Sequence, residues 1–188
     1  ADESANPAFI AADFLSQAEH GVDSQAMLVT ASESIVEPVM QAIREQLDRL
    51  PRKEITEKSL SHSRLIVLKD KQEVIDFTNL YAPEHLIIQT TDYADIAGQV
   101  ENAGSVFMGP YTPESAGDYA SGTNHTLPTN GYAKAYSGVN LDSFIKKITF
   151  QEITADGIRL LGGTIRTMAA NEQLDAHKNA VTIRLNTL

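Results

Sequence analysis

Short apolar runs alternate with segments of helical periodicity along the first 110 residues of the chain. Each run has four or five residues, which is typical of strands that are buried on both faces. The spacing between the runs leaves room for crossover helices. The pattern predicts an α/β layer architecture with a mostly parallel sheet and ligands at the loops after the strands' carboxyl ends. The four runs are 26–30, 64–68, 85–89 and 105–108.

Helical patterns fill the intervals between these runs. Ser32 and Asp70 are placed to cap the helices that follow them, and Pro51 is placed to stop the longest helix. The expected helices are 8–20, one from Ser32 to Pro51, a charged one at 52–61, one opened by Asp70 and one around 93–102.

The rhythm breaks at residues 110–140, where glycines and prolines interrupt every period. A stretch of that length without regular structure is usually functional in a compact domain. We therefore predict an α/β domain at 1–140 and a small, mainly helical C-terminal extension at 141–188. The extension is expected to hold a half-exposed strand at 147–153, a helix capped by Thr154, a last helix with Leu174 and His177, and a strand at 181–185.

The composition of the chain excludes several classes of partner and of chemical site. The 15 Lys and Arg against 25 Asp and Glu give a net charge of −10, which would repel nucleic acid. The absence of cysteine excludes disulfides, thiolate metal sites and a cysteine nucleophile, and leaves His, Asp, Glu and Gln as metal ligands. No apolar run is long enough to span a membrane, and no signal pattern opens the chain, so a cytoplasmic location is expected.

Two groups with a histidine lie in the predicted α/β domain before residue 90. Gln17 and His20 are three apart on one helical face, and both can offer a lone pair to a metal, although such a pair by itself is more often solvated or involved in capping. Glu84 and His85 follow Pro83 where a helix passes into a strand, which suits paired acid and base chemistry or an ordinary turn.

Two further groups lie later in the chain. Asp118, Tyr119 and His125 occupy the glycine-rich stretch, where they can hold a metal or a polar ligand or are simply exposed. Glu172 and His177 on the last helix are, on spacing alone, typical of a solvated face. The one histidine outside these groups, His62, is expected to be structural or exposed. The sequence contains no phosphate-binding glycine motif.

Taken in order, these groups resemble the C-terminal part of the histidinol dehydrogenase family, zinc enzymes that perform the last steps of histidine biosynthesis. The resemblance covers essentially the whole chain. The matching stretches are 13–20, 81–86, 113–119, 122–129 and 176–181.

The resemblance implies a role for each residue. Members oxidise L-histidinol to L-histidinal and then to L-histidine, using two NAD molecules. His85 would take the proton from the alcohol and later from the hydrated aldehyde, and Glu84 would activate the attacking water. The implied Zn²⁺ ligands are Gln17, His20, Asp118 and His177, and the implied substrate-binding residues are these four with His85, Tyr119, His125 and Glu172.

The resemblance also implies a homodimer in which the C-terminal extension reaches the partner's site, so Glu172 and His177 would complete the neighbour's pocket. Family members are more than twice this length, and their upstream half supplies the contacts to NAD. The chain is therefore expected to be a fragment that is inactive as a dehydrogenase by itself. Two alternatives stay open: a zinc-dependent hydrolase in which Glu84 activates water, and a non-catalytic module for binding a small ligand or for dimerisation.

Overall fold

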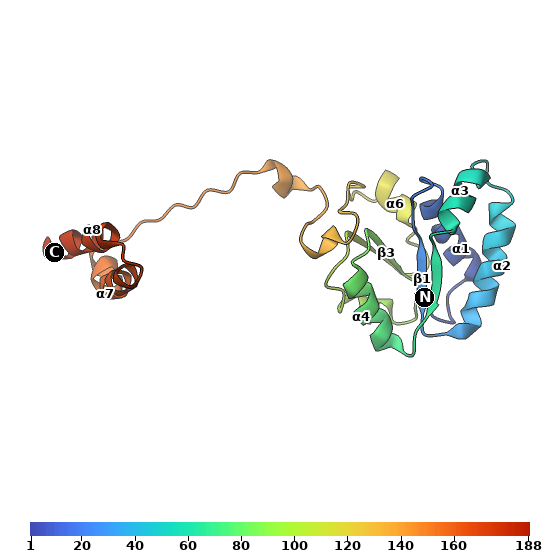
Figure 1. Cartoon of the computed structure of the whole chain (residues 1–188), viewed down its shortest axis with the longest axis horizontal. Helices are drawn as coiled ribbons and strands as arrows, with labels where there is room; N and C mark the ends of the chain where they lie inside the picture. The colour runs from blue at the N-terminus through green and yellow to red at the C-terminus, as the bar shows by residue number, and fades with distance from the viewer. The chain divides into compact units, whose positions relative to one another are not determined.

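The computed structural model describes residues 1–188 and divides the chain into two units, Ala1–Phe144 and Ile145–Leu188 (Figure 1). All four strands lie in the first unit and agree with the predicted apolar runs to within one residue at each end. This part of the α/β prediction is confirmed. The strands are β1 (Met27–Thr30), β2 (Arg64–Val67), β3 (His85–Ile88) and β4 (Ser105–Met108).

The strands form two separate parallel pairs. β1 pairs with β2, with Met27 opposite Arg64, and β3 pairs with β4, with His85 opposite Ser105. The predicted parallel pairing is confirmed. Each pair, however, is a two-stranded sheet of its own, so the strands of residues 1–188 do not join into one sheet.

Helices connect the strands, as parallel pairing requires. No helix combines the length and the apolar surface that crossing a lipid bilayer needs. In the first unit the helices are α1 (Pro7–Ala18), α2 (Val36–Leu47), α3 (Lys53–Leu60), α4 (Lys71–Tyr81), α5 (Tyr93–Ala97) and α6 (Glu114–Tyr119), with 3-10 turns η1 (Glu33–Ile35), η2 (Tyr132–Lys134) and η3 (Leu141–Phe144).

Capping by side chains agrees with the sequence at two of three predicted positions. Asp70 accepts a hydrogen bond from the Glu73 backbone N–H at 3.0 Å at the start of α4. The Thr154 hydroxyl oxygen accepts one from the Gly157 N–H at 3.1 Å. The prediction for Ser32 is wrong, because its side chain makes no capping bond and the chain first enters the turn η1.

Each strand pair has its own apolar cluster. The larger one packs α1 and α2 against β1 and has nine buried residues, among them Phe14, Leu28 and Val39. The smaller one lies beside β3 and contains only Ile75, Ile88 and Ile96 as buried members. The first unit is therefore packed most densely around β1 and more thinly around β3.

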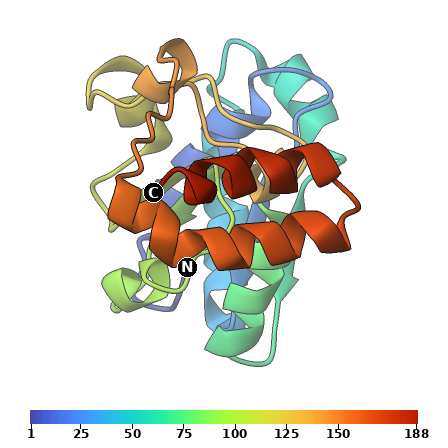
Figure 2. The same ribbon diagram turned by 90° about the vertical axis from the view of Figure 1, so that its left-hand side faces the viewer.

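The second unit consists of α7 (Ala155–Asn171) and α8 (Asp175–Asn186), which lie side by side in Figure 2, coloured orange to red. Gly162 allows this close approach, since a Cβ there would lie 2.7 Å from Leu185 Cδ1. The predicted strand at 181–185 is wrong, because these residues belong to α8. Packing of Leu185 against α7 overrides the strand preference of the β-branched residues.

The predicted strand at 147–153 is also wrong. These residues form no pairing and leave large apolar side chains open, with Phe150 90% exposed. A segment of alternating polarity forms a β-strand only when a neighbouring strand pairs with it, and the described chain has no such neighbour at this position.

Candidate active site

Three segments bring five of the predicted site residues of the first unit near one another. Gln17 lies in the last turn of α1, with His20 just beyond that helix. Glu84 and His85 lie at the amino end of β3. Asp118 comes from α6, a short helix within the stretch expected to lack regular structure. Because Glu84 and His85 precede or begin their strand, the site differs from the predicted position beyond the strands' carboxyl ends.

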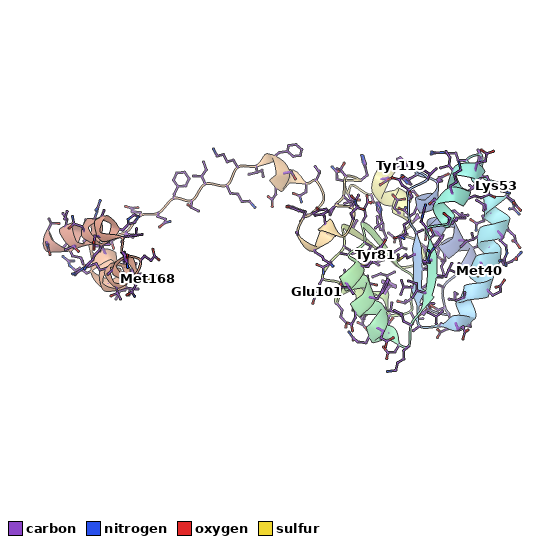
Figure 3. The ribbon with its side chains drawn as sticks, viewed as in Figure 1. Met40, Lys53, Tyr81, Glu101, Tyr119 and Met168 are labelled. Carbon is purple, nitrogen blue, oxygen red and sulfur yellow. The ribbon has the colours of Figure 1, made fainter.

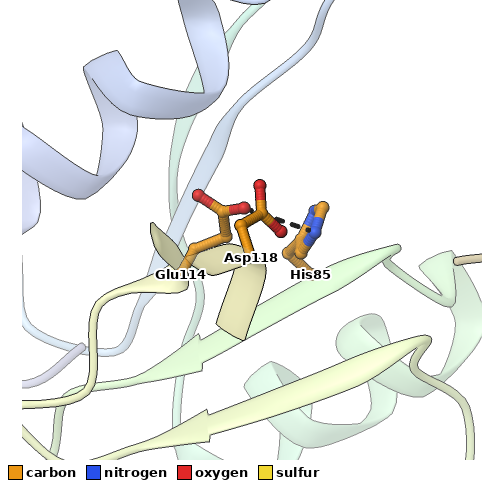
Figure 4. A group of neighbouring side chains, drawn as sticks. All are labelled: His85, Glu114 and Asp118. Carbon is orange, nitrogen blue, oxygen red and sulfur yellow. Dashed lines mark ion pairs between the residues drawn. The ribbon is translucent and has the colours of Figure 1, made fainter. Parts of the chain in front are cut away.

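Gly117 explains how α6 comes close to β4. A Cβ at this position would lie 2.7 Å from Cε1 of Phe107 and 3.1 Å from the hydroxyl of Thr123. Only glycine leaves room for this contact. The approach turns one face of α6, which carries Glu114 and Asp118 one helical turn apart, toward His85 (Figure 4).

His85, Glu114 and Asp118 form a tight group. Each offers one ligand atom, and the three atoms lie within 4.8 Å of one another. His85 Nε2 is 3.7 Å from Glu114 Oε1, which is too long for a hydrogen bond. The His85 ring also lies 6.0 Å from the ring of Phe107, centroid to centroid, so an aromatic side chain forms one wall of the group.

Several buried polar atoms of the site have no hydrogen-bond partner, namely Gln17 Nε2, His85 Nε2 and Glu114 Oε1. Buried polar atoms are nearly always partnered in folded proteins, so orphans gathered in one place indicate a site for an ion or a polar ligand. Rotation of the Gln17 amide would present its oxygen, which is a metal ligand, at the place of the nitrogen. The nitrogen and oxygen donors of this set fit a zinc ion.

Electrostatic interactions tie the same residues together. Burial raises the pKa of Glu84, with His20 opposing this effect and Asp118 adding to it. Burial lowers the pKa of His85, with Asp118 opposing and His20 adding to the effect. The pKa values of Glu84 and His85 thus move toward each other, which reduces the free-energy cost of proton transfer between them.

The sequence does not indicate Glu114 as a site residue, although its side chain is only 3% exposed, compared with 13% for His85. Burial, and then the neighbouring Asp118, raise its pKa to about 7, while an interaction with Gln17 lowers it. The four-residue interval between Glu114 and Asp118 was a possible signal. Two carboxylates four residues apart on a helix indicate a site only if they are buried, and the sequence alone does not show burial.

The structure does not bring the remaining predicted residues to this group. Tyr119 ends α6 with its side chain 86% exposed (Figure 3), and His125 is exposed in the loop that follows. Glu172 and His177 are exposed within the second unit. His62 is exposed, in agreement with its expected role.

Comparisons with known proteins agree with the geometry. The family model described as histidinol dehydrogenase matches residues 1–185. Histidinol dehydrogenase of Bacteroides thetaiotaomicron is 68% identical over 188 residues, which are 100% of this chain and 44% of that protein. The chloroplastic histidinol dehydrogenase of Arabidopsis thaliana is 57% identical, over 100% of this chain and 41% of that protein.

A solved structure gives the same result. The crystal structure of histidinol dehydrogenase from Elizabethkingia anophelis matches with a TM-score of 0.94 and 56% identity, over 100% of this chain and 43% of that chain. The chain therefore spans less than half the length of the relatives it matches.

Proposed function

This chain belongs to the histidinol dehydrogenase family, and on that premise we propose that it carries the zinc- and substrate-binding part of an NAD-dependent enzyme that oxidises L-histidinol through L-histidinal to L-histidine. The observation that carries the proposal is the meeting of Gln17, Glu84, His85 and Asp118 around orphaned buried polar atoms. Contacts to NAD are proposed to come from the part of the relatives' length that this chain does not cover. The cytoplasmic location remains a prediction of the sequence.

Gln17, His20 and Asp118 are the proposed zinc ligands of the first unit. When bound, zinc would supply a Lewis-acidic centre that fixes the imidazole and amino nitrogens of the substrate. The group of His85, Glu114 and Asp118 is a second possible donor set that shares Asp118 with the first. We favour the first set because it leaves His85 free to accept a proton.

His85 is proposed to remove protons during both oxidation steps. Its Nε2 has no hydrogen-bond partner, and burial lowers its pKa, so the ring is neutral and able to accept the hydroxyl proton as hydride leaves the adjacent carbon for NAD. Glu84 is proposed to activate the water that adds to the aldehyde. Its raised pKa strengthens it as a base for this purpose.

Glu114 is proposed as a positioning residue rather than a ligand. Burial and the neighbouring Asp118 raise the pKa of Glu114, and an interaction with Gln17 lowers it. In its protonated form it can donate a hydrogen bond to the Asp118 carboxylate and so hold one of that residue's oxygens away from the metal. The other oxygen of Asp118 would then remain available to bind the metal.

The remaining roles are assigned to the dimer. Tyr119 and His125 are proposed to hold the substrate, and Glu172 and His177 to complete the site of a second copy, with His177 as the fourth zinc ligand. Support comes from the exposure of Glu172 and His177 within their own unit, which leaves their side chains accessible to a second copy. A homodimer is therefore the proposed active assembly.

Calorimetric titration of the zinc-loaded chain with L-histidinol tests the proposal. Asp118→Asn should weaken binding at least about tenfold, because a neutral amide replaces an anionic ligand. Asp95→Asn is the matched control, since it removes the same charge from an exposed position on α5 and should leave affinity unchanged. Binding that survives in Asp118→Asn, or that is lacking in the unsubstituted chain, contradicts the proposal.

A further inference from the structure

A cavity of about 1220 Å³ lies between the two strand pairs. Residues of β1 and β3 line it, together with residues of α1 and α4, and none of β2 or β4 does so. The inner edges of the two sheets therefore face the same space. The cavity also reaches Gln17, Glu84 and His85, so whatever fills it borders the candidate active site.

The backbone groups at these two edges point into the cavity. The Thr30 carbonyl accepts from Leu68 N–H at 2.9 Å, and the Ile88 carbonyl accepts from Gly109 N–H at 2.9 Å, so these residues point toward β2 and β4. In a parallel strand, the N–H and the C=O of one residue point to the same edge, and successive residues alternate between the two edges. Val29 precedes Thr30 and Ile87 precedes Ile88, so the backbone N–H and C=O groups of Val29 and Ile87 point into the cavity.

Ala1 and Asp2 already occupy one end of this space in the manner of a strand. The nitrogen of Ala1 donates to the Val29 carbonyl of β1 at 3.2 Å. The next residue, Asp2, donates from its N–H to the carbonyl of Gln89, just after β3, also at 3.2 Å. Successive residues that bond alternately to the two sides are characteristic of a strand with a parallel neighbour on each side.

We propose that the cavity is a strand position, filled by an extended segment of histidinol dehydrogenase polypeptide from the part of the relatives' length that this chain does not cover. The segment would run parallel to β1 and β3, toward Ala1, and join the two pairs into one five-stranded sheet in the order β2, β1, added strand, β3, β4. The proposal rests on the family assignment and the strand geometry, and not on the proposed reaction.

Three observations favour this occupant over others. The relative from Bacteroides thetaiotaomicron has more than half its length outside the match, which is ample for a strand and its connections. β1 and β3 have four residues each, so a short extended segment pairs with both. An open strand edge in a cavity is satisfied by backbone donors and acceptors on both sides, which an added strand supplies and an apolar small molecule does not.

The consequence concerns the active site. An added strand would pair with the backbone beside His85 and fix the amino end of β3 from the side opposite β4. The part of the family's polypeptide outside this chain would thus build the sheet under the site as well as supply the proposed contacts to NAD.

Amide hydrogen exchange tests the strand position without zinc or L-histidinol, so it is independent of the proposed function. The chain is measured alone and mixed with the unmatched portion of the Bacteroides thetaiotaomicron histidinol dehydrogenase. The amides of Val29 and Ile87 should exchange at least about tenfold more slowly in the mixture. The amides of Leu65 and Val67, which point away from β1 on the outer edge of β2, serve as the internal control and should not change.

Two outcomes would overturn the proposal. One is unchanged exchange at Val29 and Ile87, and the other is equal slowing at the control amides, which would mean general stabilisation. Protection of Val29 and Ile87 in the chain alone, accompanied by a dimeric mass, would instead identify a second copy as the occupant and also contradict it.

A pair of variants gives an independent check. Ile87→Pro removes an N–H that points into the cavity, whereas Met108→Pro removes one that points to the outer edge of β4. Ile87→Pro should weaken association with the added polypeptide at least about tenfold, and Met108→Pro should not. Equal weakening by both variants would speak against the strand position, and the exchange measurement decides the matter if Ile87→Pro does not fold.

Discussion

The two strand pairs of the first unit differ in what surrounds them. Around β1 and β2 nine buried apolar residues form one cluster. Around β3 and β4 the cluster has three buried members, and four neighbouring buried atoms lack hydrogen-bond partners, namely His85 Nε2, Gln89 Oε1, Thr90 Oγ1 and Glu114 Oε1. The densely packed pair provides a support, and the thinly packed pair carries the candidate active site. Stability and function thus place opposite demands on adjacent parts of one unit.

Removing a large side chain from the denser cluster should have the greatest effect. Phe14→Ala is expected to lower the free energy of unfolding by about 3–5 kcal/mol, because it removes a buried ring and leaves a cavity. Urea unfolding monitored by circular dichroism measures the loss. A decrease below about 1 kcal/mol would show that the cluster around β1 is not the main support of the unit.

The difference between the pairs also explains which features could be predicted from the sequence. The sequence predicts the strands because each is a short apolar run, which is recognisable from its own residues. It does not predict the separation into two pairs, because that depends on the edges of β1 and β3 and on what lies between them. The helical state of 181–185 depends likewise on a distant contact, that of Leu185 with Gly162.

The residues of the candidate site also differ in how far the sequence alone indicates them. The sequence indicates Gln17 with His20, and Glu84 with His85, as candidates because the members of each pair are close in sequence and chemically distinctive. It does not indicate Glu114, because a single glutamate becomes notable only when it is buried beside another carboxylate. The assignments of Tyr119, His125, Glu172 and His177 stay predictions.

A methyl group at Gly117 tests whether the thin pair depends on the close approach of α6. Gly117→Ala should destabilise the first unit by about 1–3 kcal/mol, since its Cβ would lie 2.7 Å from the buried ring of Phe107. Displacement of α6 should also weaken L-histidinol binding by the zinc-loaded chain. Thermal unfolding and calorimetry measure the two effects.

Gly163→Ala is the control for this substitution. Nothing lies within 4 Å of a Cβ at this helical position in α7, so the change should stabilise the second unit by about 0.5–1 kcal/mol. If Gly117→Ala is as harmless as Gly163→Ala, the contact between α6 and Phe107 does not position the site.

The bond between Asp13 and Gln89 connects the two regions, and its pH-dependent effect on stability is expected to be smaller than that of Phe14→Ala or Gly117→Ala. Gln89, which follows β3, donates from Nε2 to Asp13 Oδ2 on α1 at 2.6 Å. Burial raises the pKa of Asp13 to about 6, against a weaker lowering by the Gln89 bond. The folded state therefore holds the Asp13 proton more tightly than the unfolded state does.

The sign of the pH dependence follows from this difference. The stabilising effect of the bound proton is complete below the unfolded pKa of about 4 and is lost as the pH rises through about 6. Because Asp13 is only partly buried, solvent screening reduces the effect to about 1 kcal/mol. Asp13→Asn, whose amide oxygen can still accept from Gln89, should remove this loss. The free energy of unfolding in urea, measured at pH 4.5 and pH 7.5, should therefore favour the variant over the unsubstituted chain more strongly at the higher pH. A difference that is the same at both pH values would mean that ionisation of Asp13 does not destabilise the folded state.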